Sequence, residues 1–201
     1  MVTRVRTHVN PLNFIEELPK KELKDIFKTP EFPLDLEIGF GKGKFIQNYA
    51  NTHKNRNILG VEVRKPLVDE LKERIKKENQ TNIHAIHGTD KQIFESIIKD
   101  QSLEKCFVFH PDPWLKKRHY KRRVINPNFI KVIHKKLIKK GKLYISTDVE
   151  SLFETMNEQL IKSNLFKTTE EKDFWESTYY THWDKFSKED HRKTYKKTYI
   201  K

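Results

Sequence analysis

The sequence predicts a single α/β domain in which a mostly parallel sheet of seven strands has helices on both faces. Three observations predict it. Short apolar runs alternate with amphipathic segments, a glycine-rich turn follows the first buried run, and neither a linker nor an internal repeat divides the 201 residues. Consecutive strands joined through helices run parallel, because right-handed crossovers return each strand to the same sheet with its helix on one face.

The expected strands are short apolar runs bounded by turn residues or charges. Five of them are Leu34–Ile38, Asn57–Val63, Ile83–His87, Lys105–His110 and Leu143–Ser146. Two late strands are expected within the aromatic and Thr-rich stretches Phe166–Phe174 and Thr194–Ile200.

The expected helices carry apolar residues at helical spacing or begin at a capping residue. Pro66 suits the first turn of a helix whose apolar face is formed by Leu67, Val68, Leu71 and Ile75. Asn126 and Pro127 begin another helix, which Gly141 is expected to end. The remaining helices are Lys44–Thr52, Ile93–Lys99 and Val149–Ser163. Residues 1–30 are expected to form a basic, flexible arm with a short helix around Lys20–Phe27, and residues 31–201 the domain itself.

The composition excludes several classes of protein. Lys and Arg number 41 against 28 Asp and Glu, so the formal net charge of +13 predicts a polyanionic partner. The lone Cys106 excludes an internal disulfide and a multi-cysteine zinc site, and His84 and His87 point to opposite faces of a strand, so no metal is expected. The sequence carries no signal-peptide pattern and no 18-residue apolar run, which predicts a cytoplasmic protein without a membrane partner.

The positive charge is concentrated in one stretch. Residues 113–147 contain no Asp or Glu but twelve Lys and Arg residues. The lysines of the expected helix suit an ordinary solvated face. The dense run after Trp114 is different, because His119 and Tyr120 interrupt it and it follows a strand end, so it predicts contacts with nucleic-acid phosphates. These candidate contacts are Lys117, Arg118, Lys121, Arg122 and Arg123.

A glycine-rich turn joins the first strand to the first helix. Gly39, Gly41 and Gly43 are spaced by two residues, unlike the dinucleotide-binding fingerprint. The preceding Glu37 would repel a pyrophosphate but suits a cationic group. Glu62 ends the second strand about 20 residues later, where an acid commonly meets ribose hydroxyls. Because dehydrogenases share such an acid, and a strand-end Glu can also be an ordinary surface residue, Glu37 and the glycine spacing decide the cofactor class.

The end of the fourth strand carries Asp112 between two prolines, with Trp114 following. Ligands of open parallel sheets bind beyond the carboxyl ends of the strands, so Asp112 is a candidate site residue. An Asp that only caps a turn is the ordinary alternative, but the cationic run that follows is unusual for a loop.

These motifs together resemble the bacterial tRNA (guanine-N7-)-methyltransferase family. The match extends from about Leu34 to Asp184 and comprises Glu37–Gly43, Pro111–Trp114, Lys116–His119, Lys121–Arg123 and Thr147–Glu150. The resemblance implies a Rossmann-like class I methyltransferase fold, S-adenosylmethionine as the methyl donor, tRNA as the partner, and N7 of a guanosine in the variable loop as the methylated atom. Whether the protein is a monomer or a homodimer stays open.

By position, the resemblance implies the following roles. The cofactor-binding residues are Glu37, Gly39, Gly41, Gly43 and Glu62, with Asp112 both bordering the cofactor and acting in catalysis or guanine contact. The family's adenine-contacting acid falls on Thr89, with Asp90 next to it, and the two stay alternatives. The substrate-binding positions are Lys116, Asp148, Thr181, His182, Trp183 and Asp184, although Asp184 stands where the family has Glu and His182 and Trp183 also differ. Leu115 replaces a common proline.

Three other readings compete with this one. An amino-methyltransferase acting on adenine or cytosine would carry a second proline after the Asp-Pro pair, where this chain has Trp114. A non-catalytic RNA-binding module on the same fold would not need the glycines and acids of the cofactor site. An NAD-dependent oxidoreductase disagrees with the glycine spacing and with the charge.

Overall fold

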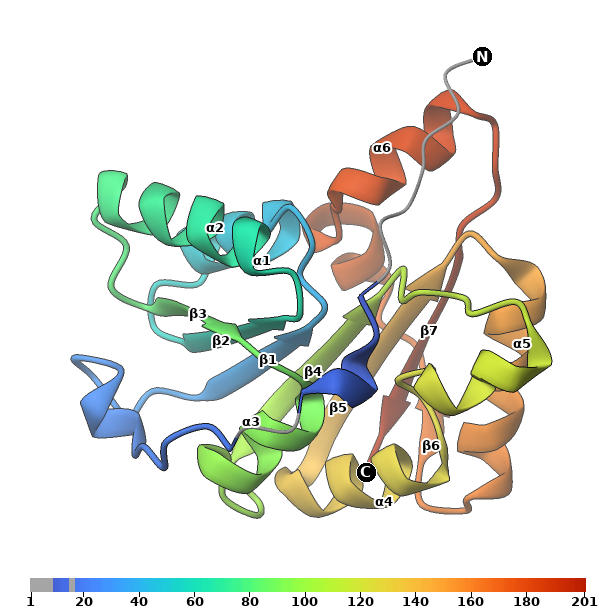
Figure 1. Cartoon of the computed structure of the whole chain (residues 1–201), viewed down its shortest axis with the longest axis horizontal. Coiled ribbons are helices and arrows are strands. Elements are labelled where there is room, and N and C mark those ends of the chain that lie inside the picture. The colour runs from blue at the N-terminus through green and yellow to red at the C-terminus, as the bar shows by residue number, and fades with distance from the viewer. Residues whose placement is uncertain (1–8, 15–16) are drawn as a thin grey trace.

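Seven strands form one sheet in the order β3-β2-β1-β4-β5-β7-β6, and the computed structural model describes residues 9–14 and 17–201 (Figure 1). The strands are β1 Leu34–Ile38, β2 Asn57–Glu62, β3 Ile83–His87, β4 Leu103–Phe109, β5 Leu137–Thr147, β6 Lys167–Thr169 and β7 Tyr195–Ile200. The first five run parallel, whereas β7 lies antiparallel to both β5 and β6. The predicted seven-stranded, mostly parallel sheet is therefore confirmed.

The described residues form six α-helices, and several begin at a side-chain cap. They are α1 Lys44–Thr52, α2 Lys65–Lys77, α3 Asp90–Ser96, α4 Pro127–Lys136, α5 Glu150–Lys162 and α6 His182–Glu189. Thr89 caps α3 by accepting the Gln92 N–H, and Asn126 caps α4 by accepting the Phe129 N–H. These caps place the start of each helix directly after the preceding strand or loop.

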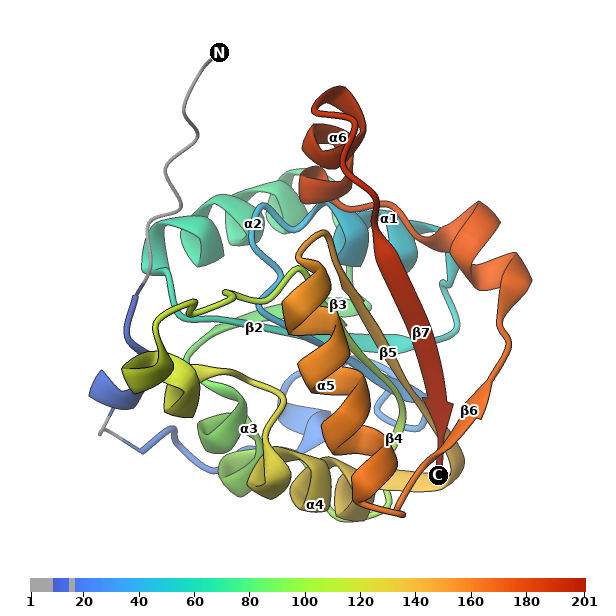
Figure 2. The ribbon, with the colours of Figure 1, turned by 90° about the vertical axis from the view of Figure 1, so that its right-hand side faces the viewer.

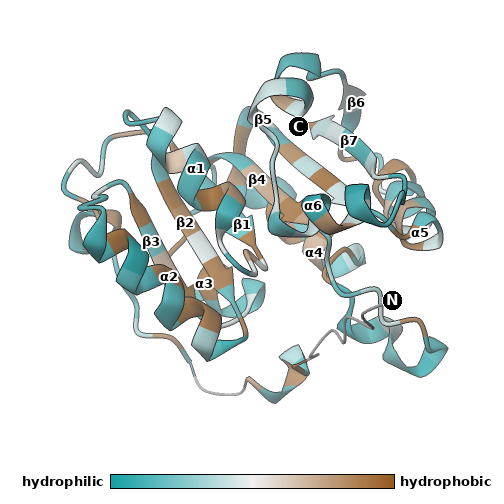
Figure 3. Ribbon diagram, turned by 90° about the horizontal axis from the view of Figure 1, so that it is seen from above, coloured by the Kyte–Doolittle hydropathy of each residue, from teal (hydrophilic) through white to brown (hydrophobic). Residues whose placement is uncertain are grey.

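The strand residues alternate between two apolar layers. Leu34, Leu36 and Ile38 pack with α3, α4 and α5, whereas α1 and α2 form the opposite layer around Phe107 (Figures 1 and 2). Figure 3 shows hydrophobic residues along the strands and hydrophilic residues on the outer sides of the helices. The remaining residues of β1, Asp35 and Glu37, are nevertheless buried. They lie on the α1 side because successive strand residues point to opposite faces.

Most strands and helices lie within a few residues of where the sequence predicts them, and larger differences occur at three places. α4 ends at Lys136, so Gly141 does not end it but lies within β5. Leu137 pairs with Leu103, and the next pair is Lys105 with Lys142, so the chain bulges between them. Leu137 is buried because it joins the sheet. In the sequence, its apolar side chain continues the helical spacing, which suggested a longer helix.

The second difference concerns the aromatic stretch after α5. β6 has only three residues, and residues 174–178 form a π-helical turn rather than more strand. The Phe174 ring stacks on the Phe107 ring with 5.6 Å between their centroids, and its centroid lies 4.2 Å from that of the Tyr144 ring. Phe174 therefore fills the α1-side core instead of pairing in the sheet. The sequence also did not separate α6 from this aromatic region. α6 lies beyond the carboxyl ends of the central strands (Figures 1 and 2).

The N-terminal segment reaches the core and the ligand-binding end of the sheet. A short 3-10 turn, Leu23–Asp25, stands in place of the expected helix around Lys20–Phe27, and Phe27 is buried in the α3-side core. Val9 lies in the wall of both cavities described below. Residues 1–8 and 15–16 of the expected basic arm lie outside the described residues.

Candidate active site

Two adjoining cavities lie at the carboxyl ends of β1, β2 and β4. The larger has a volume of about 850 Å³ and the smaller about 110 Å³. They share a wall formed by Val9, Gly39, Val63, Arg64, His110 and Asp112. This is the end of an open parallel sheet at which ligands bind.

The glycine turn needs its glycines for conformational reasons. Gly39, Gly41 and Gly43 have φ angles of 74°, 55° and 68°, in the left-handed region that side chains other than glycine rarely adopt. Gly43 directly precedes α1, and a Cβ atom there would meet Leu71 at 3.0 Å. Gly39 and Gly41 lie in the wall of the larger cavity, so the turn presents bare backbone to whatever fills it.

Glu37 is a buried acid without a full set of partners. Its side chain is almost fully buried, it lies in the wall of the larger cavity, and its Oε2 has no hydrogen-bond partner among the described residues. Burial, and secondly the nearby Glu62 carboxylate, raise the pKa of Glu37 to about 8, which the Ile46 backbone N–H only partly offsets. A buried, unpaired carboxyl group facing a cavity is suited to binding a cationic ligand.

Glu62 is buried and has several protein partners. Its Oε2 accepts the Gly41 backbone N–H at 2.9 Å, and the Arg64 guanidinium donates to both carboxylate oxygens at 2.9 and 3.0 Å. Glu62 therefore fixes the glycine turn as well as bordering the smaller cavity. Sequence reasoning missed Arg64, although a cation two residues after a strand-end acid was a visible signal.

Thr89 and Asp90 both border the smaller cavity, but their side chains differ in availability. The Thr89 hydroxyl accepts the Gln92 N–H and lies 3.1 Å from Gln92 Oε1, so it serves as the cap of α3. Burial raises the pKa of Asp90, and only backbone N–H groups oppose this effect. Of the two residues, Asp90 is therefore the one whose polar side chain is available to a ligand in the smaller cavity.

Asp112 lies where the two cavities meet. The preceding His110 is also in both walls, and its imidazole Nε2 lies 2.8 Å from the Tyr179 hydroxyl. His110 has a φ angle of 46°, so the chain turns through the left-handed region just before Pro111 and Asp112. The sequence offered no signal for this turn beyond the prolines on either side of Asp112.

Asp148 lines neither cavity but anchors α6 to the ends of β4 and β5. Its side chain is fully buried, and its Oδ1 lies 3.4 Å from His110 Nδ1. Further donors to Oδ2 are Trp183 Nε1 at 3.0 Å, Ser187 Oγ at 3.3 Å and Arg192 Nη1. Burial opposes the charge of Asp148, but hydrogen bonds from His110 and Trp183 and the charge of Arg192 outweigh it and lower the pKa. The expected substrate-binding carboxylate is thus engaged by protein groups.

The segment from Thr181 to Asp184 begins α6. Thr181, His182 and Trp183 border the larger cavity, and the Thr181 hydroxyl caps the helix by accepting the Asp184 N–H at 2.9 Å. Asp184 points elsewhere: it is buried, accepts a hydrogen bond from Thr194 and lies 3.6 Å from Lys188 Nζ. Of the four predicted substrate-binding residues here, three reach the cavity. Phe186, which no motif indicated, also lines it.

The basic loop after Trp114 is largely exposed. Lys116, Lys117, Arg118 and Lys121 have exposed side chains around a 3-10 turn, Lys117–Arg122. Arg123 differs from the expected phosphate contact. It is buried, donates to the Pro113 carbonyl at 2.9 Å and stacks 3.7 Å from the Tyr120 ring. The guanidinium is used inside the loop because it ties the two ends of the loop together.

Arg122 is half-buried, between the exposed cations of the loop and the buried Arg123. Its guanidinium lies 4.9 Å from the Trp114 ring, and both residues border the smaller cavity. Trp114 and Tyr120 thus each have an arginine over one ring face. Cys106, as expected, is a buried thiol in β4.

No group of three or more His, Cys, Asp or Glu side chains with the arrangement of a metal site occurs within residues 9–14 and 17–201. Over the same residues, no helix combines the length and apolar character required to cross a bilayer.

Comparisons with known proteins agree with this architecture. A family model described as "Putative methyltransferase" matches residues 31–201. Among solved structures, the 16S rRNA methyltransferase KamB aligns with a TM-score of 0.62 at 12% identity, covering 89% of this chain and 90% of that one. An antibiotic-related methyltransferase aligns with a TM-score of 0.60 at 17% identity, covering 96% and 97%. These similarities establish a Rossmann-like class I methyltransferase fold.

Sequence relatives are more specific. The tRNA (guanine-N(7)-)-methyltransferase of Prochlorococcus marinus (strain MIT 9515) is 35% identical over 175 residues, which span 85% of this chain and 84% of that protein. The enzyme of the same name from Thermosynechococcus vestitus is 34% identical over 171 residues, spanning 84% and 80%. This chain therefore belongs to the tRNA (guanine-N(7)-)-methyltransferase family.

Proposed function

We propose that this protein transfers a methyl group from S-adenosylmethionine to N7 of a guanosine in the variable loop of tRNA, in the cytoplasm. The observation that carries the proposal is the buried Glu37 carboxyl group with its unpartnered Oε2, beside the glycine turn in the wall of the larger cavity. In a member of this family, such a group fits the positive charge of the cofactor's methionine end.

The residues around the two cavities fit the cofactor. Glu37 would bind the ammonium group of the cofactor, and the glycine turn would allow the methionine part of the cofactor to approach the protein backbone closely. Glu62 would accept hydrogen bonds from the ribose hydroxyls. Asp90 would contact the adenine in the smaller cavity, because the Thr89 hydroxyl is already used to cap α3. When bound, the cofactor supplies an electrophilic methyl group on a positively charged sulfur.

The chemistry places few demands on proton transfer. N7 of guanine has an in-plane lone pair and carries no proton, so methylation requires no strong general base. The protein has to align N7 with the methyl carbon and tolerate the positive charge that the purine gains. Asp112, at the junction of the cavities, would accept hydrogen bonds from the guanine N1–H and exocyclic amine, which orients the base and offsets this charge.

Two groups of residues would bind the RNA. Thr181, His182 and Trp183 border the larger cavity and would contact the guanosine after it leaves the tRNA fold. The exposed Lys116, Lys117, Arg118 and Lys121 would contact phosphates nearby. We assign Asp148 and Asp184 an indirect role, because both hold α6 in place and neither lines a cavity.

The decisive experiment incubates the protein with labelled S-adenosylmethionine and unmodified tRNA, and identifies the product nucleoside by mass spectrometry. We expect 7-methylguanosine. Asp112→Asn should lower kcat by about 100-fold, because the neutral amide cannot offset the developing charge. Asp173→Asn, a change in an exposed acid that lines neither cavity, is the matched control and should retain activity.

Other products distinguish the alternatives. N6-methyladenosine or N4-methylcytidine would identify an amino-methyltransferase and overturn the N7 assignment. An absence of S-adenosylmethionine binding in calorimetry would identify a non-catalytic RNA-binding module. Transfer to a guanosine outside the variable loop would retain the chemistry but overturn the proposed position.

The phosphate contacts can be tested by salt dependence. We expect Lys117→Ala combined with Lys121→Ala to reduce the slope of log affinity for tRNA against log salt concentration by roughly 1.5, since each lost phosphate contact removes about 0.7–0.9. Lys139→Ala combined with Lys140→Ala removes two exposed lysines from the opposite end of the sheet and serves as the control. Equal slopes for the two double variants would exclude the loop as the phosphate-binding surface.

A further inference from the structure

The backbone at His110 adopts a conformation that is uncommon for residues other than glycine. Its φ angle of 46° lies in the left-handed region, and the two residues that follow are Pro111 and Asp112. For a residue other than glycine, such a conformation is uncommon and costs free energy, so neighbouring interactions must hold it. The turn decides where Asp112 lies.

The His110 side chain is held at both ring nitrogens. Only 4% of the imidazole is exposed. Nε2 lies 2.8 Å from the Tyr179 hydroxyl, and Nδ1 lies 3.4 Å from Asp148 Oδ1. Since an ionised carboxylate only accepts, Nδ1–H faces Asp148, and Nε2 shares a hydrogen bond with the Tyr179 hydroxyl.

The partners of His110 are themselves fixed. The Tyr179 hydroxyl also lies 3.0 Å from Ser146 Oγ, and its ring makes an edge contact with Phe109, 5.0 Å between centroids. The His110 backbone N–H donates to the Ser146 carbonyl at 2.8 Å. One imidazole therefore joins the end of β4, the end of β5 and the segment that leads into α6.

We propose that His110 is a positioning residue: its imidazole, held between Tyr179 and Asp148, maintains the left-handed turn that places Asp112 at the junction of the two cavities. This role rests on the proposed methyl transfer, in which Asp112 orients the guanine. Tyr179 is the second member of the arrangement, because it holds His110 without lining either cavity.

The same contacts link the two sides of the substrate cavity. Thr181 lies two residues after Tyr179 and borders the larger cavity, as His110 and Asp112 do. Asp148 holds Trp183 as well as His110. The spacing between Asp112 and the start of α6 therefore depends on this one network, and a displacement of about 1 Å is enough to lower a rate by about 100-fold.

Tyr179→Phe is the most informative variant, because it removes one hydroxyl and keeps the ring. We expect kcat for tRNA methylation to fall at least tenfold, with the KM and the Kd for S-adenosylmethionine within twofold of wild type. Tyr199→Phe is the matched control. It removes an equally buried tyrosine hydroxyl, which donates to Asn157 Oδ1 at 2.7 Å on the α5 side, and should leave kcat unchanged. Equal kcat values for the two variants would overturn the proposal.

Substitutions of His110 test the turn itself. We expect His110→Ala to lose most activity and His110→Asn to recover part of it, because Asn adopts left-handed φ angles and offers an amide to Asp148. A crystal structure of His110→Ala shows the backbone conformation at residue 110 whether or not the variant is active. We expect residue 110 to leave the left-handed region, and an unchanged position of residues 110–112 would overturn the proposal.

The outcomes separate this proposal from the proposed function. A wild-type protein that forms no 7-methylguanosine would refute the function, and the crystal structure of His110→Ala would still decide the role of the imidazole in the turn. An active wild type, with full activity in both Tyr179→Phe and His110→Ala, would refute the positioning role alone.

Discussion

Two buried acids stand two residues apart on the same face of β1 and have opposite surroundings. Asp35 accepts hydrogen bonds from Arg56 Nε at 2.6 Å and Nη2 at 2.7 Å, and from the Tyr49 hydroxyl at 3.0 Å. Glu37, nearer the carboxyl end of the strand, has an oxygen without a partner among the described residues. The two side chains share strand, face and depth of burial, so their difference isolates the effect of partners.

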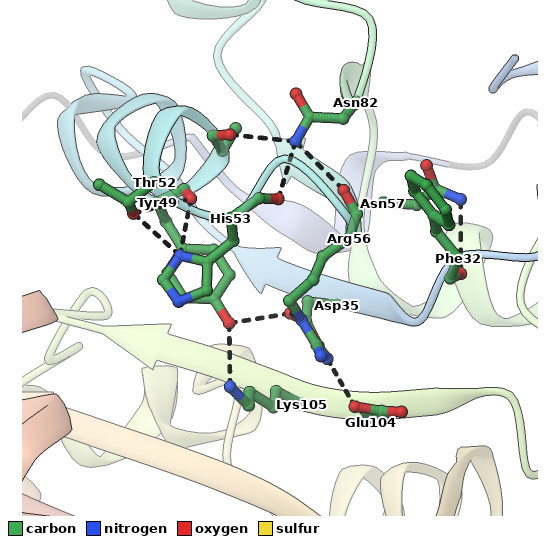
Figure 4. A network of polar contacts seen from close by, with 11 residues as sticks. Phe32, Asp35, Tyr49, Thr52, His53, Arg56, Asn57, Asn82, Glu104 and Lys105 are labelled. Atoms are coloured by element: carbon green, nitrogen blue, oxygen red, sulfur yellow. Dashed lines mark hydrogen bonds and ion pairs between the residues drawn. The ribbon is translucent and has the colours of Figure 1, made fainter. Parts of the chain in front are cut away.

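The surroundings of Asp35 form a complete polar network at the end of the sheet away from the cavities (Figure 4). Arg56 also donates to Glu104 at 2.7 Å, and Lys105 Nζ donates to the Tyr49 hydroxyl at 3.1 Å. Burial by itself disfavours the Arg56 charge, but the hydrogen bonds and charge of Asp35 raise its pKa. A fully partnered buried ion pair of this kind has a structural role, because it offers no unsatisfied group to a ligand.

The comparison teaches that burial of a carboxylate does not mark a functional site. What marks it is burial combined with a missing partner at a cavity wall, because the free energy lost in burying the group is recovered when a ligand supplies the partner.

Removal of the Asp35 carboxylate should have the largest effect, and it should be on stability. We expect Asp35→Ala to lower the free energy of unfolding by about 3–5 kcal/mol, because Arg56 is left buried with one of its two acidic partners missing. Denaturant unfolding without cofactor measures this. The matched control is Asp100→Ala, which removes an exposed acid paired with Lys135 and Lys136 and should leave the unfolding midpoint near wild type. A wild-type midpoint for Asp35→Ala would contradict the structural role.

The corresponding change at Glu37 should affect binding instead. Glu37→Gln preserves shape but removes the negative charge, so we expect the affinity for S-adenosylmethionine to fall roughly tenfold to hundredfold, in line with the loss of about 1.5–3 kcal/mol for a charged hydrogen bond. Calorimetric titration gives the Kd. The unfolding midpoint without cofactor should not fall, and a destabilised variant with unchanged Kd would reverse the roles of the two acids.

The affinity for the cofactor should also depend on pH through Glu37. Because the pKa of Glu37 is raised to about 8, the ligand-free carboxyl group is protonated at pH 7, and binding of a cationic cofactor releases a proton. We expect the affinity to rise with pH, by up to about tenfold per unit, from pH 6 to 8 and to level off above. Calorimetry in buffers of different ionisation enthalpy measures the proton release. Glu37→Gln should abolish this release, and identical pH profiles for wild type and variant would exclude Glu37 as its source.

The raised pKa of Glu37 also makes the stability of the ligand-free protein depend on pH. The folded-state pKa of Glu37 lies above its ordinary value of 4.5, so the native state binds the proton more tightly than the unfolded state. Its contribution to stability is fully present below pH 4.5 and is lost as the pH rises to about 8. Unfolding of the ligand-free wild type and Glu37→Gln proteins at several pH values tests the sign.

The smallest effect is expected at Tyr49. Tyr49→Phe removes one of the three hydrogen bonds to Asp35, at a cost of about 1 kcal/mol in unfolding free energy, and should leave the Kd for S-adenosylmethionine unchanged. Denaturant unfolding and calorimetry on the same preparation measure both. A shift in Kd would show that the two ends of β1 are energetically coupled and that the separation of roles is incomplete.

Much of the fold could be predicted from the sequence because its signals are local. β1, α1 and β3 have the predicted bounds, since apolar runs, glycines and caps act over a few residues. The same holds for the glycine turn and for Asp112, whose position after β4 follows from the order of the elements. The bulge around Gly141 could not be predicted, because the burial of Leu137 comes from its pairing with Leu103, a residue distant in the sequence.

The roles of several site residues depended on distant partners as well. Asp148 resembles a substrate-binding residue, yet its carboxylate is engaged by the residue that follows β4, by α6 and by the chain after α6. Arg123 belongs to a cationic run whose other members are largely exposed, but it folds back onto Pro113. No sequence spacing distinguishes such residues from their exposed neighbours.

The sequence by itself determined the order of strands and helices, the glycine turn, the acids at the strand ends and the stretch without negative charge, because each depends on residue type and short-range spacing. The tertiary structure decided which of these charged groups are available to a ligand. Asp35 and Glu37 are alike in the sequence, and only packing brings Arg56 to one and a cavity to the other. The physical reason is that the state of a buried charge depends on its partners, which long-range contacts supply.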